Sequence, residues 1–70
     1  MSVARVVEIS SISQKSFEDA IVQGIARANQ TLRNVKSAWV KEQEAEVNDG
    51  KVVAYKVNLK VTFVLDGSAA

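Results

Sequence analysis

Hydrophobic and polar positions divide the chain into one helical stretch and several extended ones. In the helical stretch, apolar residues recur three and four positions apart, as on one face of a helix: Phe17, Ala20, Ile21, Gly24, Ile25, Ala28 and Leu32. Ser13 and Ser16 are both candidate N-caps, and the stripe predicts a helix that ends near Arg33. Because Gly24 weakens helix propensity, its place in the stripe predicts a close approach to a strand.

The extended stretches lie on either side of this helix. Residues 3–9 are rich in β-branched side chains and alternate loosely, which predicts a first strand, and the hydroxyl-rich run 10–13 predicts its end. After Asn34 the period becomes two, and the stretches 35–47 and 51–65 flank Asn48-Asp49-Gly50, a pattern typical of a hairpin. Every odd position from Val53 to Leu65 is apolar, so one face of this strand is core and the other polar.

The hairpin register depends on the turn. A two-residue turn at Asp49 and Gly50 pairs residues whose numbers sum to 99. That register places Ala38 and Val40 on the core face, and it places four residues on the other face: Ser37, Trp39, Lys41 and Gln43. A three-residue turn would exchange the two faces.

Size and strand length both predict self-association. The chain has 70 residues and no Cys or His, so neither a disulfide nor the usual zinc site can stabilise so small a domain. Each strand of the predicted hairpin is about 43 Å long, whereas the predicted helix is about 30 Å long, so the hairpin extends beyond the helix. The far half of the hairpin, residues 42–57, would then leave four apolar side chains uncovered in a monomer: Val47, Val53, Tyr55 and Val57. We expect one domain over residues 1–66, followed by a flexible tail at 67–70.

Neither the net charge nor any segment of the sequence indicates a nucleic-acid partner or a membrane. Nine Lys and Arg against eight Asp and Glu give a net charge of +1, which is too small a bias to indicate either partner. The sequence contains no apolar run long enough to span a bilayer and no secretory signal. We therefore expect a cytoplasmic protein.

Candidate chemistry is confined to surface groups, because the absence of Cys and His removes the commonest catalytic arrangements. We expect no enzyme. Glu42, Glu44 and Glu46 alternate along one strand and could contribute to a calcium site if symmetry-related chains complete it, or form a solvated acidic edge. The single Trp, Trp39, could stack a planar ligand, anchor an interface or fill the core. Four lysines of the hairpin could attract phosphate or form a solvated face: Lys36, Lys41, Lys56 and Lys60.

Four segments together resemble the dodecin family: 6–13, 16–28, 31–35 and 55–63. The resemblance covers nearly the whole chain. It implies an α+β fold of order β-α-β-β, in which a three-stranded antiparallel sheet wraps around one helix. It also implies that twelve copies form a hollow dodecamer, which agrees with the predicted self-association.

The resemblance also marks ligand positions. Typical dodecins bind flavins, FMN or riboflavin, with a Trp and a Gln, and some bacterial members hold coenzyme A. Here Ser37 stands at the Trp position and Lys56 at the Gln position, so both flavin signatures are absent. Trp39 lies two residues further on and could take over stacking at a shift of about 7 Å. Acidic residues persist at Glu42 and Glu46.

The sequence is closest to a dodecin subgroup that lacks the flavin signatures and has been linked to calcium. We expect a non-enzymatic protein that binds or stores a small ligand or an ion through a degenerate flavin site. The alternatives are flavin binding and sequestration through Trp39, and a structural assembly without a ligand.

Overall fold

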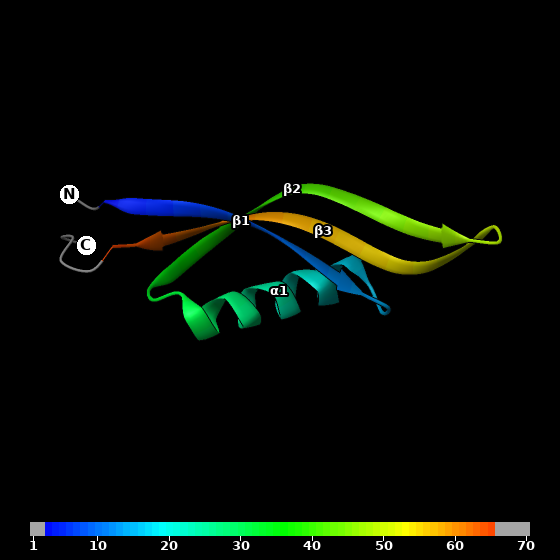
Figure 1. The fold of residues 1–70 in the computed structure, drawn as a ribbon, viewed down its shortest axis with the longest axis horizontal. Helices are drawn as coiled ribbons and strands as arrows, with labels where there is room; N and C mark the ends of the chain where they lie inside the picture. Colours follow the sequence, from blue (N-terminus) through cyan, green and yellow to red (C-terminus); the bar gives the residue numbers. More distant parts are fainter. Residues whose placement is uncertain (1–2, 66–70) are drawn as a thin grey trace.

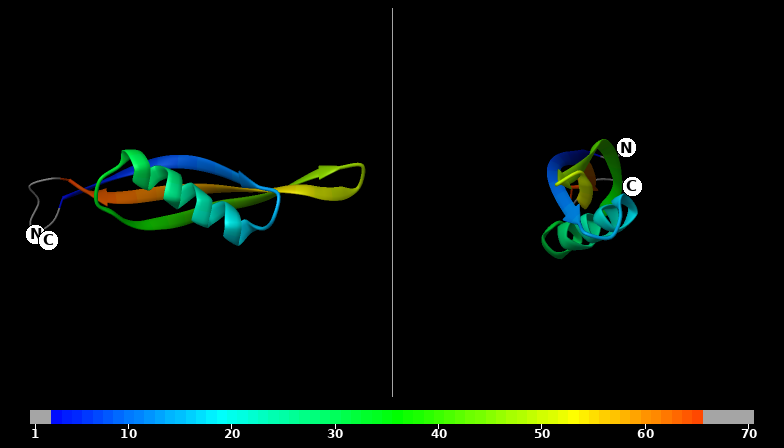
Figure 2. Two further views of the ribbon diagram at one scale, coloured as in Figure 1. Left: turned by 90° about the horizontal axis from the view of Figure 1, so that it is seen from below. Right: turned by 90° about the vertical axis from the view of Figure 1, so that its right-hand side faces the viewer.

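The computed structural model describes residues 3–65, which fold into one sheet and one helix. The elements are β1 (Ala4–Ser13), α1 (Phe17–Thr31), β2 (Val35–Asn48) and β3 (Lys51–Val64). The sheet is antiparallel with strand order β1-β3-β2, and α1 lies across one of its faces (Figures 1 and 2). This confirms the predicted β-α-β-β order and the three-stranded sheet. The predicted tail at 67–70 lies outside the described residues.

The helix begins at the second of the two predicted caps. The Ser16 hydroxyl accepts a hydrogen bond of 2.9 Å from the Asp19 backbone N–H. Ser13 instead holds the approach to the helix, because its hydroxyl donates to the Asp19 carboxylate at 2.6 Å and accepts from the Lys15 N–H at 2.9 Å. The helix ends at Thr31 with Leu32 as its C-cap, so Arg33 lies beyond it.

The first strand is longer than its sequence predicted. Ladder pairing with β3 continues through the hydroxyl-rich run to Ser13, which lies opposite Tyr55. The prediction that residues 10–13 leave the strand is wrong because the Ser10 hydroxyl finds a partner across the sheet and the Ser13 hydroxyl finds partners next to the helix. Ser10, for example, donates to the side-chain oxygen of Asn58 at 2.7 Å.

The core lies between the middle of β3 and the apolar stripe of α1. Val57, Leu59 and Val61 are fully buried and form one cluster with Ala20 and Ala28. The helix packs tightly on β1 at Gly24. If this residue carried a Cβ, that atom would stand 2.9 Å from the Ser11 Cβ. This confirms the close approach predicted from Gly24.

The hairpin turns on two residues, as one of the two predicted registers requires. Asp49 and Gly50 have positive φ values of 54° and 76°, and Asn48 lies opposite Lys51. The register does not stay constant, because a bulge between Val40 and Glu42 shifts the pairing. Gln43 consequently lies opposite the buried Val57 instead of sharing a face with Trp39, so its predicted placement is wrong.

The end of the hairpin extends past both β1 and α1 (Figure 1). We call residues 45–54 the hairpin tip, because β1 pairs with β3 only from Tyr55 onward. Val47, Val52 and Val53 are between 47% and 63% exposed there, whereas Val57 is covered by the helix and Tyr55 packs edge-on against Phe17. The predicted uncovered surface is therefore confirmed for Val47 and Val53 and wrong for Val57, because the helix begins close to that part of β3.

Candidate ligand-binding face

The sheet face turned away from α1 carries most of the polar side chains of the strands. We call it the open face. Directly paired residues point to the same side of a sheet. The register therefore places three sets of residues there: Glu8, Ser10 and Ile12 from β1; Lys56, Asn58, Lys60 and Thr62 from β3; and Ser37, Trp39, Glu42, Glu44 and Glu46 from β2. Each residue predicted for a ligand or metal site is among them.

The bulge at Lys41 brings the β2 members of this set together. Before the bulge, odd-numbered residues pair with the open-face side chains of β3, and Trp39 lies opposite Lys60. After it, even-numbered residues do so, and Glu42 lies opposite Asn58. The one extra residue therefore places the indole and the acidic row on the same side of the sheet.

Trp39 is the most exposed of the large hydrophobic residues in the described part of the chain, with 68% of its surface accessible. The Lys60 Nζ lies 5.5 Å from the centre of its ring, in the geometry of a cation–π contact. Glu8 lies on the other side of Lys60 in the ladder, but its carboxylate pairs with Lys41 at 3.5 Å. A flat apolar surface thus stands beside an ammonium group, which is a pairing suited to a planar anion.

A chain of hydrogen bonds crosses the sheet one row further along. The Ser10 hydroxyl donates to Asn58 Oδ1 at 2.7 Å, and Asn58 Nδ2 donates to the Glu42 carboxylate at 3.0 Å. Each group is exposed or partly exposed, so water still reaches it. These two hydrogen bonds fix the orientation of Glu42 and leave its second carboxylate oxygen for another partner.

The rest of the acidic row is held less firmly. Glu44 pairs with Lys56 at 3.8 Å, an exposed contact of small energetic value. Among residues 3–65 no three acidic side chains gather closely enough to hold a metal ion. A calcium ion needs six to eight oxygen ligands, so a cation site on this face requires carboxylates from more than one copy of the chain.

The sequence identified the β2 members of the face and Lys56 of β3, but missed the hydrogen-bond partners on the other strands. Ser10 and Asn58 were not predicted as site residues, although they form its contacts, and Lys60 was predicted only as one of several lysines that could attract phosphate. Alternation in β3 already placed Asn58 and Lys60 on the polar side. The missing information was the pairing of β1 with β3, which a single sequence does not reveal because the two strands are separated by the whole helix and hairpin.

No helix in the described part of the chain is long and apolar enough to cross a membrane.

Comparisons with known proteins agree with this architecture. The family model described as Dodecin matches residues 3–66. The chain is 32% identical to the calcium dodecin of Mycobacterium tuberculosis over 90% of this chain and 89% of that protein. It is 37% identical to a dodecin of Thermus thermophilus over 86% and 87% of the two chains. The solved dodecin from Streptomyces davaonensis superposes with a TM-score of 0.88 at 38% identity, covering 93% and 96% of the two chains. The chain therefore belongs to the dodecin family.

Proposed function

We propose that this protein is a non-enzymatic homododecamer that binds or stores a small ligand on the open face of its sheet. The observation that carries the proposal is the pairing of Trp39 with Lys60 at 5.5 Å, which offers a stacking surface and a positive charge side by side. The family's small-ligand character and the absence of catalytic Cys and His support a binding role.

The ligand best suited to this surface is a planar ring system that carries a phosphate. Ser37 and Lys56 stand where the family resemblance places the stacking Trp and the flavin-binding Gln, so the ordinary flavin contacts cannot form. An ammonium group at Lys60 favours an anionic ligand over a neutral one. FMN should therefore bind more tightly than riboflavin, which has the same ring system without the phosphate.

Fluorescence titration tests this proposal directly, because Trp39 is the only Trp in the chain. We expect FMN to quench its emission at lower concentration than riboflavin, and Lys60→Met to remove most of the difference. Lys51→Met is the matched control, since Lys51 is an exposed lysine at the hairpin turn, opposite Asn48, and the change in charge is the same. No quenching by either flavin would refute flavin binding at Trp39 and favour the cation role or a ligand-free assembly.

Calcium binding is the second candidate function. It is favoured by the orientation of Glu42 through Asn58, by Glu44 and Glu46 in the same row, and by a relative that is named calcium dodecin. Calorimetric titration with calcium should give a signal that Glu42→Gln weakens and that Glu18→Gln, a change on the exposed side of α1, leaves unchanged. Equal binding by both variants would contradict a site at Glu42.

Native mass spectrometry of protein purified without added ligand tests the assembly itself. Twelve subunits are expected, and any retained flavin or metal would appear in the same spectrum as a mass increment. A monomer at every concentration would refute the homododecamer.

A further inference from the structure

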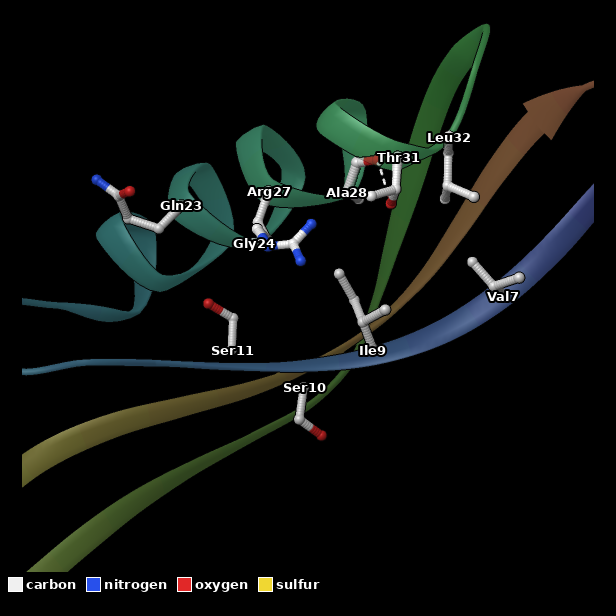
Figure 3. A pocket seen from close by; sticks show the side chains of 10 residues that line it. All are labelled: Val7, Ile9, Ser10, Ser11, Gln23, Gly24, Arg27, Ala28, Thr31 and Leu32. Atoms are coloured by element: carbon white, nitrogen blue, oxygen red, sulfur yellow. Dashed lines mark hydrogen bonds between the residues drawn. The ribbon is translucent and has the colours of Figure 1, made fainter.

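A groove runs between α1 and β1 on the helix side of the sheet (Figure 3). It has a volume of about 610 Å³. Its helix wall is built from residues four apart, with Gln23, Arg27 and Thr31 on the rim and Gly24, Ala28 and Leu32 inside. Val7 and Ile9 of β1 form the floor. The helix and β1 touch at Gly24, and the groove stays open next to Ala28, which has only a methyl group to fill it.

The groove has the length of a short strand. From Gln23 to Leu32 the helix rises about 14 Å. A strand of four residues spans about 13 Å. β1 is an edge strand of the sheet, so its outer backbone groups make no ladder with another described strand. The groove is therefore long enough to hold about four residues of an extended segment.

The hairpin tip defined above has the matching surface. Three valines of the tip are between 47% and 63% exposed, and α1 covers none of them: Val47, Val52 and Val53. A two-stranded ribbon of this kind is marginally stable in water without a covering layer. The molecule thus contains an apolar groove without an occupant and an apolar ribbon without a cover.

Charge is complementary between the two surfaces. The Arg27 side chain extends from the helix toward the groove in Figure 3, and within residues 3–65 no ion pair joins it to a carboxylate. Glu46 on the tip likewise lacks an ion pair with any described residue. A cation at the groove and a carboxylate on the tip favour one orientation of contact.

The contact must join two molecules. The tip projects beyond the N-terminal end of α1, whereas the groove follows the C-terminal half of the helix (Figure 1). The longest dimension of the chain is 51 Å, and its hairpin points away from its own groove. We propose that the groove between α1 and β1 receives the hairpin tip, residues 45–54, of a second copy, with Arg27 facing Glu46 of that copy. This inference rests on the homo-oligomer of the proposed function.

Charge reversal tests the contact. Arg27→Glu and Glu46→Arg should each raise the protomer concentration at which half of the assembly dissociates by about tenfold or more. The double variant should recover most of the loss, because the two charges are again opposite. Lys15→Glu is the matched control, since Lys15 is exposed outside the groove and the change in net charge equals that of Arg27→Glu. All three positions are exposed, so circular dichroism should show an unchanged fold.

The outcomes separate this contact from assembly as such. A wild-type chain that stays monomeric would overturn both the assembly and the contact. A wild-type assembly that Arg27→Glu leaves intact, or a double variant without recovery, would overturn the contact alone. Those results would assign the groove to another occupant, such as a small amphipathic molecule.

A cross-linking measurement gives an independent answer, because the chain has no Cys of its own. A variant with Thr31→Cys and Val47→Cys should form chain-to-chain links with a short bifunctional maleimide. A variant with Lys15→Cys and Val47→Cys should link far less. Equal linking in the two variants would overturn the proposed placement of the tip.

Discussion

The contact between α1 and β1 at Gly24 makes a strong prediction about a single methyl group. A Cβ at this position would stand 2.9 Å from the Ser11 Cβ and 3.1 Å from the Leu59 Cδ1. The Ser11 Cβ is attached directly to the backbone of β1, so it can give way only if the strand or the helix moves. Gly24→Ala should therefore separate the two elements slightly and destabilise the fold.

Two opposing contributions decide the size of this effect. Replacing Gly by Ala inside a helix improves helix propensity by about 1 kcal/mol. Overpacking a filled contact costs about 1–3 kcal/mol. The net expectation is a loss of about 1 kcal/mol in the free energy of unfolding, which lowers Tm by about 4–8 °C in a domain of this size.

Thermal unfolding followed by circular dichroism measures this loss. All variants must be compared at one protomer concentration, because assembly shifts Tm by mass action. Ala26→Gly, at an exposed position of the same helix, measures the propensity contribution by itself. Ser11→Gly removes the closest atoms, so in a double-mutant cycle it should make Gly24→Ala less damaging. A higher Tm for Gly24→Ala, or no coupling with Ser11→Gly, would refute the steric argument.

Three further changes test local features of the fold by chemical denaturation. Ser16→Ala removes the hydrogen bond to the Asp19 N–H and should cost about 1 kcal/mol, whereas Ser16→Thr should retain most of it. Gly50→Ala places a side chain at a φ of 76° and should cost about 1 kcal/mol, and an unchanged stability would contradict the turn geometry. Glu8→Gln breaks the ion pair with Lys41. The side chains of Glu8 and Lys41 are 49% and 43% exposed, so the free energy of unfolding should fall by less than about 1 kcal/mol. A larger fall would contradict the assignment of this ion pair as a weak surface contact.

The helix and the hairpin could be predicted because their signals are local. The apolar stripe of α1 needs only a period of three to four, and the turn needs only Asp49 and Gly50 between alternating stretches. The end of β1 could not be predicted in this way, because serine favours turns in an isolated segment. In the folded chain, Ser10 finds Asn58 on β3, and this tertiary contact outweighs the local preference.

The open face of the sheet was predicted in composition but not in arrangement. Trp39 and the acidic residues were identified from their types, whereas the cation beside the indole and the amide that holds Glu42 come from β3. Such partners depend on strand register. Periodicity within one strand carries no information about a bulge in the ladder.

The bulge at Lys41 has a physical cause that links the core to the open face. With a constant register, Glu42 would lie opposite Val57, which is fully buried, and its carboxylate would point toward the apolar cluster under α1. Burying an unpaired carboxylate is very costly, whereas one extra residue in an edge strand costs little. The bulge moves Gln43 to the side of Val57 and turns Glu42 to Asn58. The energetic requirement of the core therefore places the indole, the cation and the acidic row on one accessible face of the sheet.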